Sequence, residues 1–284
     1  MEQTGKPRTW VITGSSTGFG RLLAEEVLKA GENVVVTARK VEQVADLEEK
    51  YPGHAVALAL DVTKQDQVDA AVAKTLERFG RVDVLVNNAG YGVIGALEEV
   101  ADAELEPMYA TNVFGLLRVT RAFLPQFRKQ RSGHILNVSS IGGLTASPGW
   151  GIYQSSKFAV EGLSEALAQE VAALGIHVTI IEPGPFRTDF LGRSGVEAAK
   201  EIEDYATTAA IGRRYRSDQN GRQPGDPLKA VQAMIQVVDS KNPPLRLLLG
   251  AGALKRLRQK LEAWQKEIAA WEPVTVGADF PEGT

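Results

Sequence analysis

The sequence predicts an α/β protein built on a doubly wound parallel sheet of about seven strands, with helices on both faces. Short apolar runs alternate regularly with longer stretches of helical period, which is the pattern of repeated strand–helix–strand units. The runs are nearly continuous in Val, Ile and Leu, as expected of strands buried on both faces. The predicted strands are Trp10–Thr13, Asn33–Ala38, Ala55–Leu60, Val82–Asn87, His134–Val138, His177–Ile181 and Arg246–Leu249.

The stretches between these runs are rich in Ala, Leu, Glu and Lys, residues that favour helix. The chain contains no internal repeat, no low-complexity tract and no stretch that reads as an interdomain linker. We therefore expect residues 1–284 to form a single domain. The predicted helices are Gly20–Ala30, Glu42–Lys50, Gln65–Phe79, Leu105–Lys129 and Tyr153–Leu174.

Two regions break the alternation. Residues 188–223 mix glycines with charged residues and lack a strong period, which is typical of a lid or substrate-binding segment; a variable surface insertion is the alternative. Residues 252–284 form a helical C-terminal extension with one apolar stripe. We expect the stripe to pack on the domain's own core or across a dimer interface, with membrane association as the alternative. The stripe consists of Leu254, Leu257, Leu261, Trp264, Ile268 and Trp271.

The composition excludes several functions. Of the 284 residues, 44% are hydrophobic and 24% charged, with a formal net charge of −3, which argues against disorder and against nucleic-acid binding. The absence of cysteine excludes disulfides, thiolate catalysis and zinc fingers. No apolar run approaches the ~20 residues of a membrane span, and the first ten residues lack the apolar region of a secretory signal. The three histidines lack metal-ligand spacing, so we expect a cytoplasmic protein without a metal, a membrane partner or a nucleic-acid partner.

A glycine-rich loop follows the first predicted strand and opens the first helix. Glycine lets the backbone turn sharply and approach a pyrophosphate without an intervening Cβ, and the helix N-terminus offers free N–H groups to the anion. The loop therefore predicts a dinucleotide cofactor. Its spacing is Gly-x-x-x-Gly-x-Gly, which differs from the Gly-x-Gly-x-x-Gly of the long-chain dinucleotide binders. The residues assigned to the cofactor here are Gly14, Ser16, Gly18, Phe19 and Gly20.

The end of the second strand favours NADP(H) over NAD(H). NAD-binding proteins usually place an acidic residue here to hold the ribose 2′-hydroxyl, whereas an Arg accommodates a 2′-phosphate. This chain has Arg39 and Lys40 at that point and no acidic residue at the strand end. Glu42 lies in the following helix, where it offsets the N-terminal dipole. NAD(H) remains the alternative if Arg39 is merely solvated or covers the adenine.

Tyr153 and Lys157 form a Tyr-x-x-x-Lys motif at the start of a predicted helix. The spacing places the phenol and the ammonium side by side on one helix face. A phenol with a pKa near ~10 is a poor acid–base group at neutral pH, and a neighbouring cation is expected to lower that pKa toward the working range. The motif therefore predicts an acid–base tyrosine.

Polar residues and glycines close three successive strands. Asn87-Asn88-Ala89-Gly90 ends the fourth, Asn137-Val138-Ser139-Ser140 the fifth, and Glu182-Pro183-Gly184-Pro185 the sixth. The carboxyl ends of parallel strands are where open α/β sheets hold their ligands, so we expect a cofactor to lie across this edge. The alternative for Asn87 and Asn88 is that they stabilise the central strands.

Together these motifs resemble the short-chain dehydrogenase/reductase family, the compact Rossmann-fold type. TGSSTGFG, NNAG, NVSS followed by YQSSK, and PGPFRT occur in the family's order and spacing. The similarity covers roughly Thr9 to Gly252, nearly the whole chain.

The resemblance implies a catalytic role for four residues. Tyr153 is the acid–base that passes a proton to or from the substrate oxygen, and Ser140 holds that oxygen. Lys157 lowers the pKa of the phenol and binds the nicotinamide ribose. Asn112 resembles the Asn that anchors a water linking Lys157 to solvent, although a polar packing residue is the alternative. Ser139 is interpreted as structural, because Ser140 has the family spacing to Tyr153.

The resemblance also implies cofactor contacts at Asp61, which resembles the Asp that meets adenine, and at Thr188, which resembles the Thr that meets the carboxamide. Capping of a lid helix is the alternative for Thr188. One departure concerns Thr17, because some NADP-preferring members carry a basic residue there. The other implied cofactor-binding residues are Arg39, Val62, Asn88, Ala89, Gly90, Tyr153, Lys157, Pro183 and Gly184.

The sequence thus predicts an NADP(H)-dependent oxidoreductase that interconverts a secondary alcohol and its ketone or aldehyde. Apolar residues flank the site segments and indicate a bulky apolar substrate; the length and the extension resemble family members that act on steroids, retinoids and other bulky ketones. The family implies a homodimer or homotetramer, formed through the helices at 105–129 and 153–174. The expected substrate contacts are Ser140, Leu144, Trp150, Tyr153, Phe186 and Phe190.

Two other functions are less consistent with the sequence. A non-catalytic, redox-sensing regulator is the main alternative, but relatives of that kind usually lose the Tyr or Lys that this chain keeps. A sugar-nucleotide epimerase or dehydratase would need a larger C-terminal substrate domain and a different glycine loop.

Overall fold

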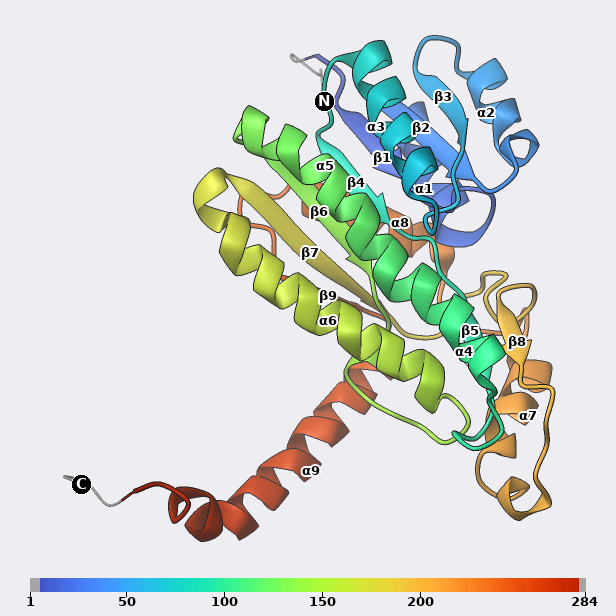
Figure 1. Cartoon of the computed structure of the whole chain (residues 1–284), viewed down its shortest axis with the longest axis vertical. Coiled ribbons are helices and arrows are strands. Elements are labelled where there is room, and N and C mark those ends of the chain that lie inside the picture. Colours follow the sequence, from blue (N-terminus) through green and yellow to red (C-terminus); the bar gives the residue numbers. More distant parts are fainter. Residues whose placement is uncertain (1–5, 281–284) are drawn as a thin grey trace.

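The computed structural model describes residues 6–280, and within this range seven parallel strands form the central sheet in the order β3-β2-β1-β4-β6-β7-β9 (Figure 1). The sheet confirms the predicted fold class and each of the seven predicted strands. The main differences in bounds are that β4 begins two residues later and β7 runs on to Pro183. The strands are β1 Thr9–Ile12, β2 Asn33–Ala38, β3 Ala55–Ala59, β4 Val84–Asn87, β6 Gly133–Val138, β7 Ile176–Pro183 and β9 Arg246–Leu249.

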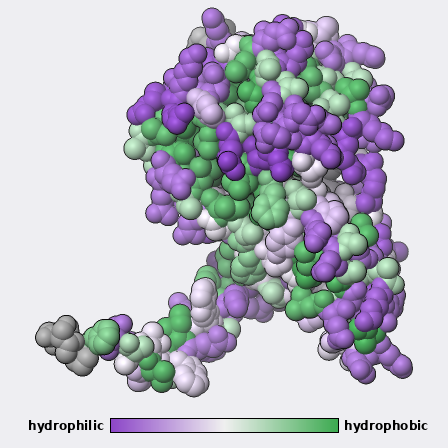
Figure 2. Space-filling model, in the orientation of Figure 1, coloured by the Kyte–Doolittle hydropathy of each residue, from purple (hydrophilic) through white to green (hydrophobic). Residues whose placement is uncertain are grey.

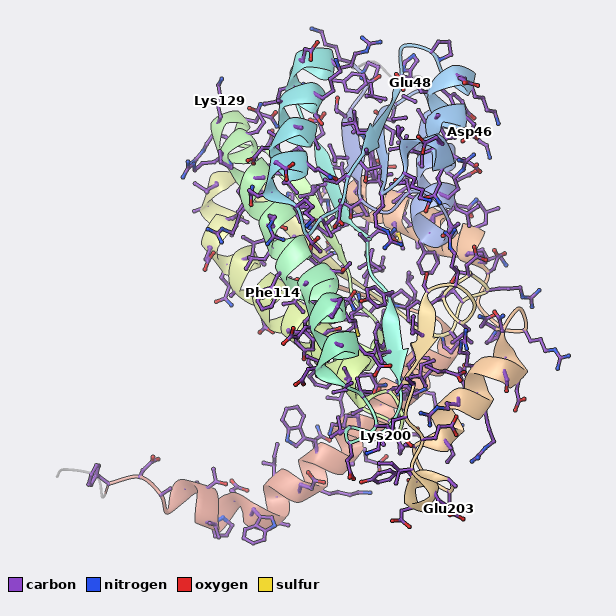
Figure 3. The ribbon with its side chains drawn as sticks, turned by 45° about the vertical axis from the view of Figure 1, so that its right-hand side comes forward. Asp46, Glu48, Phe114, Lys129, Lys200 and Glu203 are labelled. Carbon is purple, nitrogen blue, oxygen red and sulfur yellow. The ribbon has the colours of Figure 1, made fainter. Side chains whose placement is uncertain are left out.

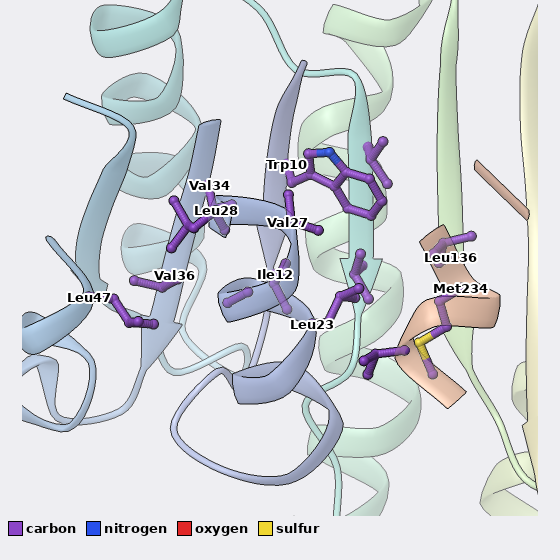
Figure 4. Packing of buried hydrophobic residues seen from close by; sticks show 14 of the residues in the cluster. Trp10, Ile12, Leu23, Val27, Leu28, Val34, Val36, Leu47, Leu136 and Met234 are labelled. Atoms are coloured by element: carbon purple, nitrogen blue, oxygen red, sulfur yellow. The ribbon is translucent and has the colours of Figure 1, made fainter. Parts of the chain in front are cut away.

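Helices cover both faces of the sheet because successive strand residues point to opposite sides. In β1, Trp10 and Ile12 join a buried cluster with α1, α2 and α8 (Figure 4). Val11 joins a second cluster with α3, α5 and α6, and Figure 1 labels the helices of both clusters. All three side chains are fully buried. This two-sided burial explains why the strands read as continuous apolar runs. The helices are α1 Gly18–Lys29, α2 Ala45–Lys50, α3 Gln65–Phe79, α5 Leu116–Gln130, α6 Gly151–Val171 and α8 Pro227–Val238.

The predicted helix at 105–129 has a wide turn inside it. Helix α4, Asp102–Tyr109, passes through a π-helical turn at Ala110–Gly115 into α5. Pro107 lies inside α4 and has no N–H for the helical ladder. The wider turn directs Asn112 inward, where it is 1% exposed. Such turns are frequent at functional sites.

The segment 188–223, which was expected to be a lid, contains a strand and a helix that the sequence pattern did not predict. Strand β8, Gly195–Glu197, pairs in parallel with β5, Gly92–Ile94, outside the main sheet. Helix α7, Ala210–Gln219, packs beside them. Two ion pairs fix it, from Arg213 to Glu99 at 2.9 Å and from Arg216 to Glu197 at 2.8 Å.

Helix α9, Ala251–Val276, leaves the body of the molecule and points away from it (Figure 1). Of its residues only Ala253 is buried. Leu261 is 46% exposed, Trp264 55% and Trp271 64%. Figure 2 shows hydrophobic residues on the surface of this projecting helix. The expectation that the stripe packs on the domain's own core is therefore wrong, because both faces of the sheet are already covered by other helices.

No helix within residues 6–280 is both long enough and apolar enough to cross a membrane.

Candidate active site

A cavity of about 1210 Å³ opens at the carboxyl edge of the sheet, where β1, β4, β6 and β7 end. This is the edge at which open α/β sheets bind ligands. Most residues predicted from the sequence lie on its wall. They are Gly14, Ser16, Gly18, Phe19, Arg39, Asp61, Val62, Asn88, Ala89, Gly90, Ser140, Trp150, Tyr153, Lys157, Pro183, Gly184, Phe186, Thr188 and Phe190.

Three predicted residues lie off the wall. Gly20 sits behind the glycine loop, and Asn112 lies beneath Gly90. The expectation that Leu144 contacts the substrate is corrected, because Leu144 does not line the cavity. The chain turns away from the cavity in the 3₁₀ turn Ile141–Gly143, and the next lining residue is Ser147.

The glycine loop is shaped by its own conformation and by Asn88. Gly14 and Gly18 have φ values of 69° and 58°, in the region that glycine adopts without strain. The Asn88 amide nitrogen donates to the carbonyls of Thr13 at 3.0 Å and Gly14 at 2.9 Å. Asn88 thus holds the end of β1 and the loop that follows it. The N-terminus of α1 adjoins the cavity at Gly18 and Phe19, where its free N–H groups are available to an anion.

The basic and acidic residues expected at the adenosine end lie where the sequence placed them. Arg39 and Lys40 line the cavity after β2. Burial raises the pKa of Asp61, but hydrogen bonds from Thr63 outweigh it, so the pKa lies below its ordinary value and the carboxylate stays ionised. An anion-binding loop, two cations and a carboxylate together fit a nicotinamide dinucleotide.

Tyr153, Ser140 and Lys157 come together below the loop. Tyr153 is 7% exposed and Lys157 6%. The Lys157 ammonium donates to the carbonyl of Val138 at 2.8 Å and lies 5.8 Å from the centre of the Tyr153 ring. The predicted side-by-side placement of phenol and ammonium is therefore present.

The pKa values of this pair differ from the expectation. Burial raises the pKa of Tyr153 to about 12, against a hydrogen bond from Ser140 that lowers it. Burial lowers the pKa of Lys157 to about 8, against the nearby Glu161 carboxylate, which raises it. For Tyr153, the desolvation of the phenol outweighs the lowering of its pKa that was expected from the neighbouring ammonium. The phenol is therefore protonated at neutral pH in this arrangement.

The side-chain amide of Asn112 forms hydrogen bonds with the backbone of Tyr91. Its nitrogen donates to the Tyr91 carbonyl at 2.8 Å and to Ser156 Oγ at 3.1 Å, and its oxygen accepts the Tyr91 N–H at 3.0 Å. These bonds tie the π-helical turn to the segment that follows β4, and the role of Asn112 beside Lys157 stays a prediction.

Asn87 binds neighbouring secondary structure instead of facing the cavity. Its amide nitrogen donates to Asn137 Oδ1 and to Thr120 Oγ1, both at 2.8 Å, and Asn137 in turn donates to Ser164 Oγ at 2.8 Å. This network supports the structural interpretation of Asn87.

Aromatic rings form the wall beside Tyr153. Trp150 stacks on Phe190 with 6.4 Å between ring centres, and Phe190 lies 5.2 Å from the ring of Tyr153. Phe186 instead packs on Phe19 of the glycine loop at 5.4 Å, so it belongs to the cofactor half of the cavity.

Four of the lining residues that sequence reasoning missed come from α7, α9 and β8. Ile211 and Tyr215 come from α7, where their spacing of four residues was a usable signal. Arg256 comes from the start of α9 and Val196 from β8, and neither belongs to a recognisable motif. Within residues 6–280, no group of His, Asp or Glu is arranged to hold a metal ion.

Comparison with known proteins agrees with this geometry. The family model "short chain dehydrogenase" matches residues 8–198. The chain is 39% identical to oxidoreductase BOA17 of Botryotinia fuckeliana, over 95% of this chain and 99% of the relative. It is 38% identical to a 3-ketodihydrosphingosine reductase of Bacteroides thetaiotaomicron (91% and 93%) and 36% identical to human retinol dehydrogenase 8 (84% and 80%).

Solved structures share the fold. A short-chain dehydrogenase from Streptomyces avermitilis superposes with a TM-score of 0.91 at 43% identity, over 97% of this chain and 100% of that one. A short-chain dehydrogenase/reductase of Burkholderia phymatum in complex with NAD gives 0.82 at 25% identity (94% and 97%). ElxO with NADP bound gives 0.73 at 28% identity (88% and 100%).

The family match, the nicotinamide-bound structural neighbours and the Ser140–Tyr153–Lys157 group at the cavity lead to one conclusion. This chain belongs to the short-chain dehydrogenase family and is an oxidoreductase that uses a nicotinamide dinucleotide and acts on CH–OH donors.

Proposed function

We propose that this protein is an NADP(H)-dependent oxidoreductase that interconverts a bulky, apolar secondary alcohol and its ketone or aldehyde. The observation that carries the proposal is the grouping of Ser140 with the buried Tyr153 and Lys157 on the wall of a cavity that Trp150 and Phe190 also line.

Each residue of the group has a defined task. The nicotinamide supplies or accepts the hydride. Ser140 donates a hydrogen bond to the substrate oxygen, and the Tyr153 hydroxyl gives its proton to that oxygen in the reduction direction and recovers it in oxidation. Lys157 holds the nicotinamide ribose and provides positive charge beside the phenol, which stabilises the phenolate formed in the reduction direction. The aromatic wall orients the substrate and excludes water.

The preference for NADP(H) rests on the end of β2. Arg39 and Lys40 line the cavity there, and β2 ends without a carboxylate that could hold a ribose 2′-hydroxyl. Thr17 lacks the basic group found in some NADP-preferring relatives, but Arg193 donates to its hydroxyl at 3.0 Å and brings a cation to the same loop.

The proposed substrate class follows from the wall of the cavity. The names of two relatives, a 3-ketodihydrosphingosine reductase and a retinol dehydrogenase, denote activity on long or bulky apolar molecules. We assign residues 1–284 to one functional unit in which 188–223 is the substrate lid.

We further propose that the chain works as a homo-oligomer. Phe114, at the junction of α4 and α5, is 56% exposed (Figure 3). Phe158 on α6 is 46% exposed. These are the two long helices expected to form the interface, and a second copy would cover both side chains.

The stripe of α9 suits a second contact with a copy of this chain. Its residues alternate three and four apart, which is the seam of a coiled coil. With two α9 helices antiparallel, Leu261 meets the partner's Trp264, and Lys260 faces the partner's Glu267. In a parallel pair, Glu267 would instead face the partner's Glu272, two like charges. Charge complementarity therefore selects the antiparallel pair.

The test of the proposed function starts with fluorescence titration of NADPH and NADH, followed by a ketone panel with the cofactor that binds. We expect tight, selective NADPH binding and turnover of bulky ketones. The variant Tyr153→Phe should bind NADPH normally and lose turnover. Normal turnover in that variant would refute the role of the tyrosine, and binding of neither cofactor would favour the regulator.

A further inference from the structure

Arg256 lines the cavity beside Ser147 and Tyr215. It comes from the second turn of α9 and shares the wall with Trp150, Ile211 and Tyr215. It is half-buried, and burial lowers its pKa from the ordinary value. The side chain therefore places a partly desolvated positive charge on the wall of the cavity.

The hydrogen bonds of Arg256 hold it in place without neutralising it. Its Nη2 donates to Thr145 Oγ1 at 2.8 Å and to Ser147 Oγ at 2.9 Å, which leaves N–H groups on Nη1 and Nε. Within residues 6–280, no carboxylate pairs with this guanidinium. Arg213 and Arg216 on the adjacent helix α7 each pair with a glutamate.

The other charged groups on the wall lie elsewhere. Arg39, Lys40 and Asp61 are at the adenosine end, and Lys157 is beside Tyr153. Arg193 bonds to Thr17 of the glycine loop, and Asp189 follows Thr188, whose side chain lies beside Gly18 of that loop. Among the described lining residues, Arg256 is thus the charged side chain of the substrate end.

We propose that Arg256 binds a carboxylate on the substrate, so that the enzyme acts on an oxo acid or hydroxy acid with an apolar body. The reacting carbon lies at Tyr153, the apolar body lies along Trp150 and Phe190, and the carboxylate reaches the guanidinium. This inference deepens the proposed function and rests on it.

A carboxylate fits this end better than a phosphate. The N–H groups left on Nη1 and Nε give a carboxylate charge-assisted hydrogen bonds to a single cation. A phosphate dianion calls for a second cation, which the described lining residues do not supply here. Tyr215 interacts electrostatically with Arg256, and burial raises its pKa, so its hydroxyl stays protonated and adds a hydrogen-bond donor.

The first experiment compares methyl-ketone acids of graded chain length with their methyl esters, as substrates of wild type, Arg256→Met and Arg256→Lys. We expect the wild type to have a lower KM for the acid of the best length than for its ester. Arg256→Met should raise the KM for the acid roughly tenfold to hundredfold, the range of a lost charged hydrogen bond. It should leave the ester within about twofold, because the ester makes no charged contact to lose. Arg256→Lys should restore part of the preference.

Arg258→Met is the matched control, since Arg258 lies on the same helix, is exposed and does not line the cavity. Equal effects of Arg256→Met on acid and ester, or a wild type without preference for the acid, would overturn the carboxylate site. Turnover of the esters reports on the proposed function independently.

A binding measurement separates the two proposals even without turnover. Calorimetric titration of the NADPH-loaded protein with decanoate, decanol and decyl phosphate needs no chemistry at Tyr153. We expect decanoate to bind more tightly than decanol in the wild type, and Arg256→Met to abolish the difference. Tighter binding of decyl phosphate than decanoate would overturn the choice of carboxylate, and equal binding of decanoate and decanol would overturn the anion site.

Discussion

Gly20 and Gly162 form a matched pair of helical glycines with opposite surroundings. A Cβ on Gly20 would lie 2.4 Å from the Gly14 carbonyl oxygen and 2.5 Å from the Asn88 amide nitrogen, whereas a Cβ on Gly162 in α6 meets nothing within 4 Å. Gly20→Ala must displace the glycine loop, so we expect a loss of about 1–3 kcal/mol in unfolding free energy and weaker NADPH binding.

The control, Gly162→Ala, should raise the unfolding free energy by about 0.5–1 kcal/mol, because alanine loses less entropy in a helix, and should leave NADPH binding unchanged. Urea unfolding and fluorescence titration measure both effects. If Gly20→Ala bound NADPH as well as Gly162→Ala does, the close packing behind the loop would be irrelevant to the cofactor.

Arg39 carries the proposed cofactor preference. Arg39→Asp replaces the cation at the end of β2 with a carboxylate, which repels a 2′-phosphate and accepts a hydrogen bond from a 2′-hydroxyl. We expect the ratio of NADPH to NADH affinity to fall by roughly tenfold to hundredfold. The comparison is with Arg222→Asp, an exposed arginine that does not line the cavity. An unchanged ratio in Arg39→Asp would remove Arg39 from the site.

Site residues were predictable from the sequence where their spacing along the chain alone determines that they lie close together. Tyr153 and Lys157 share a helix face because they are four residues apart, and the glycine loop follows its strand directly. Leu144 was not predictable, because its position depends on which way the chain turns after Ser140. Arg256 was not predictable either, because a folded helix 99 residues beyond Lys157 brings it to the cavity.

At the scale of elements, α9 carries the sharpest prediction. The double variant Leu261→Lys/Trp264→Lys places like charges in the proposed seam, so we expect the assembly to lose this contact and the mass in light scattering to fall. The matched control is Lys255→Glu/Lys266→Glu, which changes charge on the same helix outside the seam. If the seam variant kept the mass of the wild type, α9 would not join copies of the chain. If the wild type bound lipid vesicles and the seam variant did not, the stripe would be assigned to a membrane surface instead.

The elements divide by length into those that the sequence reveals and those that it does not. The central strands are buried on both faces, so their apolar runs are unambiguous. Strands β5 and β8 have three residues each, too few to show a period, and their pairing joins segments about 100 residues apart. The π-helical turn left no mark in the apolar pattern because the helix continues on both sides of it.

At the scale of the whole molecule, His134 couples stability to pH. It lies in β6 and is 5% exposed, with Nε2 2.9 Å from Thr179 Oγ1. Burial lowers its pKa to about 4, with a smaller contribution from His177. The unfolded chain therefore binds this proton first, so the contribution of neutral His134 is present above the ordinary pKa of 6.5 and is lost as the pH falls toward 4.

We expect His134→Gln to flatten the pH dependence of unfolding between pH 7 and 4 by up to ~3 kcal/mol, the value of the shift at 1.36 kcal/mol per unit. Glu182 titrates in the same range with the opposite sign, because burial and Glu161 raise its pKa to about 7. The contribution of Glu182 is the same in wild type and variant, so it cancels when the unfolding free energy of one, measured in urea, is subtracted from that of the other. His54→Gln is the control, since His54 is exposed and does not contribute to the pKa shift of His134. Identical slopes in wild type and His134→Gln would contradict the assignment.

The place of β1 in the middle of the sheet has a consequence for synthesis on the ribosome. The chain leaves the ribosome from its N-terminus, so β1 and the glycine loop emerge first, yet both neighbours of β1 come later. The loop takes its final shape only when the Asn88 amide reaches the carbonyls of Thr13 and Gly14, about 75 residues further on. We expect nascent chains stalled before β4 to be unable to retain the nucleotide and those stalled after α5 to begin to do so. Retention of the cofactor would then report when the first half of the enzyme has folded.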